Sequence, residues 1–140
     1  MAAPNLVNVS TITPDLVMKT EISTALVPST ITAKSVQAAL TTTLTTEVLA
    51  NASSSNKVFK VNNILIANID GTNAVDISVF ITKSGGSPIA IASTISVPAD
   101  SSLVVIDKNS ALYLEEGDNI EAGAGAASDA VITINYEELS

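Results

Sequence analysis

The chain has 140 residues and a formal net charge of −8, from 14 acidic residues and six lysines, and it contains no Cys, His, Trp or Arg. The usual nucleophile–base pairs, imidazole and thiolate metal sites, and bidentate phosphate recognition by arginine are therefore all missing. The acidic balance argues against non-specific binding to nucleic acid or to anionic membranes, because both require cationic patches.

The apolar residues are mainly aliphatic. Hydrophobic residues make up 46% of the chain, but aromatic residues only 3%. The core must therefore be built from Val, Ile, Leu and Ala, with four rings in all: Phe59, Phe80, Tyr113 and Tyr136. β-Branched side chains pack well on a pleated surface, so this composition predicts strands.

The first part of the chain, residues 1–50, is rich in Ser, Thr and Pro, and its hydrophobic residues are scattered. Leu6 and Val7 fall in a possible first strand, and Val36–Leu49 can supply one or two more. We therefore expect residues 1–50 to form an N-terminal arm together with the first strands of the domain. Met1–Pro4 has no basic residue, so a secretory signal peptide is not expected.

A short repeat interrupts this part. Ser10–Thr13 recurs as Ser29–Thr32, and the two copies bracket Pro14–Pro28. One hypothesis is that residues 14–32 are an insertion that forms an arm or an extra hairpin. A chance match in a chain rich in Ser and Thr is the alternative.

The second part, residues 51–140, is expected to form the main domain. Turn signals at Asp70–Asn73, Ser84–Pro88 and Pro98–Asp100 separate runs that alternate between polar and apolar residues. The predicted strands, of which the sixth is weak, are Lys57–Ala67, Val75–Ile81, Ile89–Val97, Leu103–Ile106, Ala111–Leu114, Ile120–Gly125 and Ala130–Tyr136.

This spacing of short strands is typical of sandwiches and barrels. No long segment has helical periodicity, and each sheet must bury one face. The sequence therefore predicts an all-β fold, an antiparallel β-sandwich of jelly-roll type with an extended N-terminal arm. The uncharged stretch Ser84–Ala99 is interrupted by Gly and Pro and is too short and too polar to span a bilayer.

No group of residues predicts a catalytic, cofactor-binding or metal-binding site, so an enzyme is not expected. Glu115–Asp118 is the densest acidic group, and it fits a strand-ending turn with exposed carboxylates better than a Ca²⁺ loop. Glu137 and Glu138 are expected in a solvated tail. Gly123 and Gly125 lack the third glycine of a dinucleotide-binding loop.

Several turn and strand segments resemble small virion structural proteins of tailed bacteriophages, notably those that infect cyanobacteria and marine bacteria. The resemblance covers the first 13 residues and most of residues 51–140. The segments that carry it are Asn5–Thr13, Val58–Ile64, Ala67–Ala74, Ser96–Asp100, Leu112–Asp118 and Asn135–Ser140. The segment from about 14 to 32, absent from shorter relatives, is a departure from that pattern.

The resemblance implies a β-sandwich on the exterior of the capsid, as a decoration (cement) protein that binds the major capsid protein. Because cement proteins commonly form trimers, it also implies a homotrimer. No cofactor is implied, and no functional residues carry over. An extended arm can add to a neighbouring sheet through backbone hydrogen bonds, or fold onto its own domain. In the first case we expect interface contacts from the apolar residues Leu6, Val7, Leu16, Val17 and Met18.

Two other functions remain open at this stage. The chain can be a structural component of the neck, tail or fibre rather than of the head. It can also be a module that binds carbohydrate or Ca²⁺ at the host surface, although the small number of rings argues against sugar binding.

Overall fold

A computed structural model describes residues 30–140, and Ile31–Ser140 form one compact unit. The unit consists of strands, turns and a short 3-10 helix, η1 (Lys108–Ser110). In chain order the strands are β1 (Ile31–Ala39), β2 (Thr46–Ala50), β3 (Val58–Asn68), β4 (Val75–Thr82), β5 (Ile89–Val97), β6 (Ser102–Ile106), β7 (Leu112–Leu114), β8 (Asn119–Ala124) and β9 (Ala130–Leu139).

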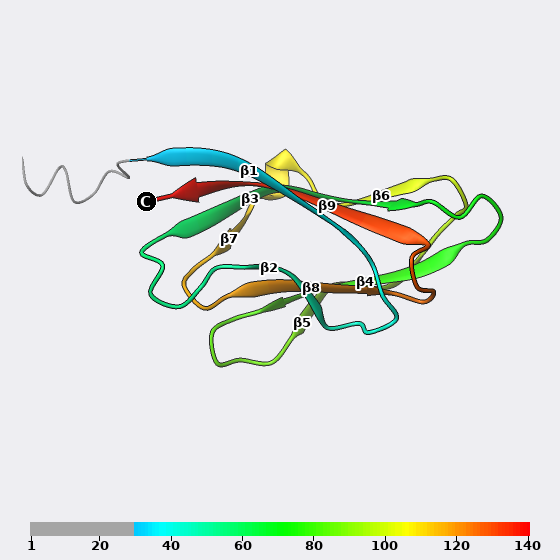
Figure 1. The fold of residues 1–140 in the computed structure, drawn as a ribbon, viewed down its shortest axis with the longest axis horizontal. Coiled ribbons are helices and arrows are strands. Elements are labelled where there is room, and N and C mark those ends of the chain that lie inside the picture. Colours follow the sequence, from blue (N-terminus) through cyan, green and yellow to red (C-terminus); the bar gives the residue numbers. More distant parts are fainter. Residues whose placement is uncertain (1–29) are drawn as a thin grey trace, which may run out of the picture. The chain divides into compact units, whose positions relative to one another are not determined.

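The strands form two antiparallel sheets that lie face to face (Figure 1). Sheet A has the strand order β1-β9-β3-β6, and β7 pairs with β3. Sheet B has the order β2-β8-β4-β5. The prediction of an antiparallel β-sandwich is therefore confirmed. The prediction of an extended arm falls mainly on residues outside the described part of the chain.

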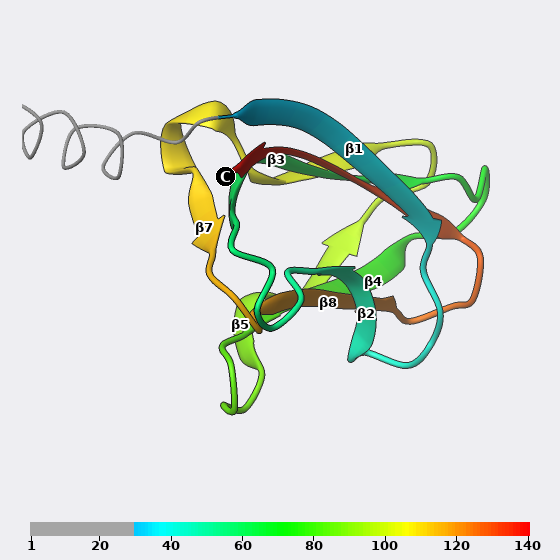
Figure 2. The ribbon, with the colours of Figure 1, turned by 60° about the vertical axis from the view of Figure 1, so that its left-hand side comes forward.

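The connectivity is that of a jelly roll. With β7 set aside, the strands pair from the two ends of the domain inward: β1 with β9, β2 with β8, β3 with β6, and β4 with β5. Successive pairs alternate between sheet A and sheet B, so the hairpin of paired strands wraps around the core. Figure 2 shows β7 running from the layer of sheet A towards that of sheet B.

The sandwich begins earlier in the chain than residue 51. β1 and β2, which fall in the part expected to be an arm with the first strands, are integral to the two sheets. β1 pairs with β9 from Ile31 opposite Leu139 to Ala39 opposite Val131. Ile31 and Thr32 are thus the start of β1 and not the end of an insertion over 14–32. The rest of that segment, and the expected strand at Leu6, lie outside the described residues.

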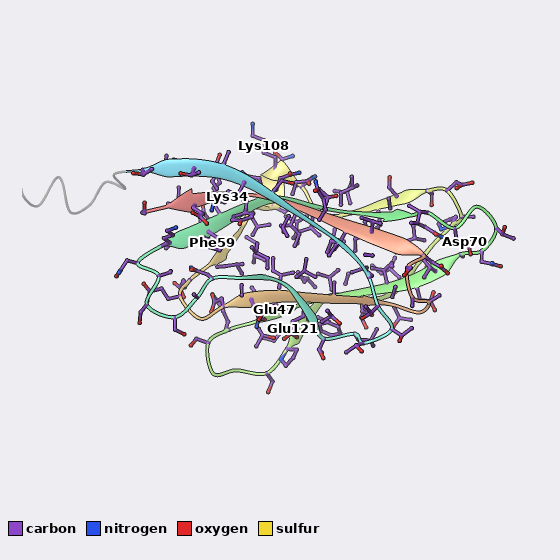
Figure 3. The ribbon with its side chains drawn as sticks, in the orientation of Figure 1. Lys34, Glu47, Phe59, Asp70, Lys108 and Glu121 are labelled. Atoms are coloured by element: carbon purple, nitrogen blue, oxygen red, sulfur yellow. The ribbon has the colours of Figure 1, made fainter. Side chains whose placement is uncertain are left out.

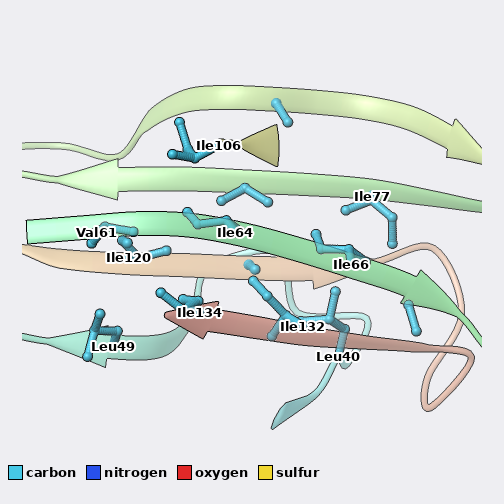
Figure 4. Packing of buried hydrophobic residues seen from close by; sticks show 14 of the residues in the cluster. Leu40, Leu49, Val61, Ile64, Ile66, Ile77, Ile106, Ile120, Ile132 and Ile134 are labelled. Atoms are coloured by element: carbon cyan, nitrogen blue, oxygen red, sulfur yellow. The ribbon is translucent and has the colours of Figure 1, made fainter. Parts of the chain in front are cut away.

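The core is aliphatic, as the composition predicts. Alternating residues of β3 and β9 point from sheet A towards alternating residues of β4 and β8 in sheet B (Figure 4). Interdigitated branched side chains of this kind account for most of the favourable free energy of folding of a small sandwich. The isoleucines with no exposed surface are Ile64, Ile66, Ile77, Ile120, Ile132 and Ile134.

The four rings divide between core and surface. Phe59 and Tyr136 lie in the core with ring centroids 5.1 Å apart. Phe80 lies opposite Glu121 on the outward side of sheet B, and the side chain of Tyr113 is 51% exposed. Only half of the scarce aromatic residues therefore contribute to the core.

Candidate interaction surface

Sheet A presents a broad outer face with no net charge. The inward residues of β3 and β9 are buried, so the alternate residues point outward, and the residues of β1 opposite these outward residues of β9 lie on the same face. We call these residues the neutral face: Ile31, Ala33, Ser35, Gln37 and Ala39 of β1; Val131, Thr133, Asn135, Glu137 and Leu139 of β9; and Lys60, Asn63, Leu65 and Ala67 of β3. Its two charged members are Lys60 and Glu137, which pair with each other at 3.8 Å between Nζ and Oε2.

Small polar side chains hydrogen-bond along the centre of this face. The Asn135 side-chain amide donates to the Asn63 carbonyl oxygen at 2.9 Å, and Gln37 donates to the Ser35 hydroxyl at 3.3 Å. An open depression of about 370 Å³ lies here, and its lining includes the oppositely charged residues Lys34 and Glu137 together with Ser35 and Asn135. A surface of this kind can receive uncharged or weakly polar groups of a partner protein.

Sheet B presents an acidic outer face. Its strands contain Glu47, Asp76 and Glu121 and no lysine, and all three acids occupy outward positions. Glu47 lies directly opposite Glu121 across β2 and β8, and Figure 3 shows both on the layer of sheet B. The Asn119 side-chain amide donates to Glu47 at 3.3 Å. Like charges opposed across two strands are unfavourable, so this face repels acidic surfaces, including that of another copy.

Glu138 is not part of a solvated tail, as the sequence analysis predicted, but a buried residue of β9. Its carboxylate pairs with Lys34 of β1 and Lys57 before β3, each at 2.9 Å between nitrogen and oxygen. Hydrogen bonds from Lys34 and then Lys57 hold the pKa of Glu138 below its usual range. The three side chains tie β1 and the start of β3 to β9.

Asp118 also differs from the expected exposed turn. The acidic group Glu115–Asp118 does form the turn between β7 and β8, but the Asp118 side chain is only 3% exposed. Its carboxylate accepts from Lys83 Nζ at 2.6 Å and from the backbone N–H groups of Ser84 and Glu115 at 3.0 and 2.8 Å. Burial alone raises the pKa of Asp118, but these hydrogen bonds outweigh it and hold the pKa below its usual range.

Replacing Asp118 with asparagine is expected to lower the free energy of unfolding by about 2 kcal/mol at pH 7, mainly because the amide nitrogen of asparagine cannot accept one of the two backbone hydrogen bonds. Lys83 is half-exposed, so the ion pair itself contributes less. Because the folded-state pKa is lowered, the contribution of Asp118 is present above the unfolded pKa and is lost as pH falls through the folded pKa.

Urea denaturation at pH 7 and below about pH 4 tests this dependence on pH. The difference between wild type and D118N should narrow in acid. D76N is the matched control at an exposed site, expected to change stability by less than about 0.5 kcal/mol. If D118N is as stable as D76N at pH 7, the hydrogen bonds to the Asp118 carboxylate do not stabilise the domain.

No cluster of three or more His, Cys, Asp or Glu side chains that could hold a metal ion occurs within residues 30–140. In the same part of the chain, no helix has the length and hydropathy needed to cross a membrane.

The residues predicted to form an interface, Leu6, Val7, Leu16, Val17 and Met18, all lie outside the described residues. The neutral face was not identified from the sequence, because it depends on which strands lie side by side. Alternation within β1, β3 and β9 was the available signal, but the order β1-β9-β3 could not be read from it.

Neither a protein-family model nor a curated protein matches the chain.

Proposed function

We propose that the protein is a structural protein of a phage virion, namely a capsid decoration protein that stabilises the head from its exterior by bridging subunits of the major capsid protein. The bacteriophage assignment rests on the resemblance of the turn and strand segments. In this proposal the protein is a homotrimer, and it acts by binding rather than by catalysis.

The charge difference between the two outer faces supports this role. The neutral face has one lysine and one glutamate, which pair with each other, whereas the strands of sheet B carry three acids and no lysine. A protein that coats a shell needs one face for the shell and one for solvent. The neutral face is suited to the shell because little charge must be desolvated there, and the acidic face is suited to solvent.

Purified protein is expected to bind undecorated heads and to raise the temperature at which they disrupt, because each bound copy bridges several capsid subunits. Binding is measured by co-sedimentation with heads, and head stability by thermal scanning. Immunogold labelling of intact particles should mark the head surface. Label confined to the neck, tail or fibres would reject the proposal in favour of the alternative structural role.

Two matched substitutions test which face binds. Ser35 is an exposed residue of the neutral face midway along β1, and Ser96 is an exposed residue opposite Asp76 on sheet B. S35E should weaken head binding because it places an uncompensated charge in the contact. S96E adds the same charge to the face assigned to solvent, so it should bind like wild type. Equal binding by the two variants would remove the neutral face from the contact.

A further inference from the structure

The strand β5 has an unusual amount of exposed apolar side chain for the edge of a sheet. It is the last strand of sheet B and pairs on one side with β4. Ile89, Ile91 and Ile95 are 61%, 37% and 39% exposed, and we call these three side chains the β5 strip. Exposed apolar strips of this kind mark contact sites or aggregation sites.

Two of the other edge strands carry a charged residue, whereas β5 carries none. β1 carries Lys34 and β2 carries Glu47, and charges of this kind discourage edge-to-edge contact. β6 also has no charged residue, but it is only five residues long, against nine in β5. The charge-free run extends beyond the strand, from Ser84 to Ala99.

The geometry of β5 favours contact through side chains over a continuous backbone ladder. Its register with β4 shifts twice, so that Ile77, Val79 and Phe80 lie opposite Ile95, Ala92 and Ala90. Between the two paired segments, Thr94 has a φ of 51°. Its N–H donates to the buried Ser78 hydroxyl at 3.0 Å. Such bulges twist an edge strand and redirect its side chains, which accounts for the isoleucines at the surface.

We propose that the β5 strip is a self-association site, at which β5 of one copy packs against β5 of a second copy about a two-fold axis. Charge favours a second copy of this chain as the partner that binds the β5 strip. Copies with a net charge of −8 repel one another, so they approach best where neither presents an acid. The β5 strip is uncharged and apolar, and a two-fold axis makes an apolar strip complementary to itself.

This contact goes beyond the proposed role on the capsid and does not depend on it. A single pair of edge strands buries a small area, below the roughly 1,000 Å² typical of stable specific complexes. The association is therefore weak in solution and strengthened wherever copies are concentrated on one surface. Failure to bind heads would leave this inference standing. Absence of the β5 contact would leave the proposed capsid role standing, because the neutral face, and not β5, is assigned to the shell.

Sedimentation velocity of the full chain, at concentrations up to about 1 mM and at low and high salt, tests the association. We expect a reversible oligomer that becomes stronger at high salt, because salt screens the repulsion between acidic copies while apolar contact persists. An interface built on ion pairs would instead become weaker at high salt, because salt screens the attraction between opposite charges. A sedimentation coefficient that does not increase with concentration under any of these conditions overturns the proposal.

A pair of isoleucine-to-lysine variants locates the contact. Ile89 and Ile31 are similarly exposed, at 61% and 64%, but they lie on β5 and on β1, at edges of different sheets. I89K and I31K change the net charge equally and should both fold. I89K should abolish the salt-strengthened association, and I31K should retain it. The reverse result, or equal association in both variants, overturns the proposal.

Cross-linking tests whether β5 of a second copy covers the β5 strip. The chain has no cysteine, so a single I91C substitution gives a specific reporter in the middle of the β5 strip. Mild oxidation should give a disulfide-linked dimer of I91C and much less of I31C, because a disulfide requires Cα atoms within about 7 Å. If I89K abolishes association but I91C does not cross-link, a different segment covers β5 and the two-fold pairing is wrong.

Discussion

Replacing Gly123 with alanine is expected to destabilise the domain by about 3 kcal/mol, although the substitution adds only a methyl group. Gly123 is a buried residue of β8. A Cβ at this position would lie 2.5 Å from Leu44 Cα and 2.6 Å from the Thr43 carbonyl oxygen. Both atoms belong to the backbone of the β1–β2 loop, so neither can move aside by a change of rotamer.

The loop cannot shift without loss of hydrogen bonds on either side of the contact. The backbone N–H of Ala124 donates to the carbonyl oxygen of Thr41 at 2.9 Å, and that of Ser128 donates to the carbonyl oxygen of Leu40 at 3.0 Å. Relief of the clash would lengthen these bonds and expose Leu40, which is only 2% exposed. The expected loss combines strain with weakened hydrogen bonds at a buried site.

Gly125, the residue after the end of the same strand, provides the matched control. A Cβ there would have its nearest neighbour at 3.6 Å, an ordinary van der Waals distance, and its φ is not positive. G125A should therefore be neutral or slightly stabilising, because alanine restricts the unfolded chain. Urea denaturation of both variants gives the comparison. A G123A protein as stable as G125A would show that the loop does not lie against β8 as described.

The same glycine explains why β8 looked weak in the sequence. The segment Asn119–Ala124 is rich in Ala and Gly, a composition that gives little strand propensity. The small residues at this site are explained by the β1–β2 loop, which crosses directly over Gly123. By contrast, β5 was predicted with the bounds it has, Ile89–Val97, because turn residues flank an alternating run.

The burial of Glu138 could not be predicted from the sequence either, because it depends on residues of other strands. Glu138 stands near the C-terminus among polar residues, so local sequence predicts a solvated tail. Its burial depends on Lys34 and Lys57, which reach it only because β1 and β3 lie near β9 in the sheet. The neutral face could not be predicted for the same reason. The order of the strands in the sheet brings Ser35, Asn135 and Asn63 together, and no single strand contains this information.

Replacing Asn68 with aspartate is expected to destabilise the domain by more than about 3 kcal/mol, although the two side chains have nearly the same shape. Asn68 is 3% exposed at the end of β3. Its side-chain amide nitrogen lies within hydrogen-bond distance of three backbone carbonyl oxygens, those of Asn73 and Val97 at 2.9 Å and that of Pro98 at 3.1 Å, so one of its two N–H groups is shared between two of them. Its own carbonyl oxygen accepts from the backbone N–H of Asp70 at 2.9 Å.

Asn68 therefore links the end of β3 in sheet A to the start of β4 and the end of β5 in sheet B. An aspartate would replace the donating amide with a second acceptor oxygen, directed at three carbonyl oxygens in a buried site. Three hydrogen bonds would become repulsive contacts, and a charge would be buried without a partner. N68A removes the amide without adding a charge, so its loss of stability should be smaller, about 1–3 kcal/mol for the hydrogen bonds that are lost.

The pH dependence of the N68D variant separates repulsion from a simple loss of packing. Burial among carbonyl oxygens would raise the pKa of the new carboxyl above its unfolded value. The penalty would then be fully present above the folded-state pKa and would decrease as the group becomes protonated in acid. N109D makes the same change at an exposed position of η1 and should be close to neutral. If N68D matches N109D, or if its penalty relative to N109D does not shrink in acid, Asn68 does not donate to the carbonyl groups that join the two sheets.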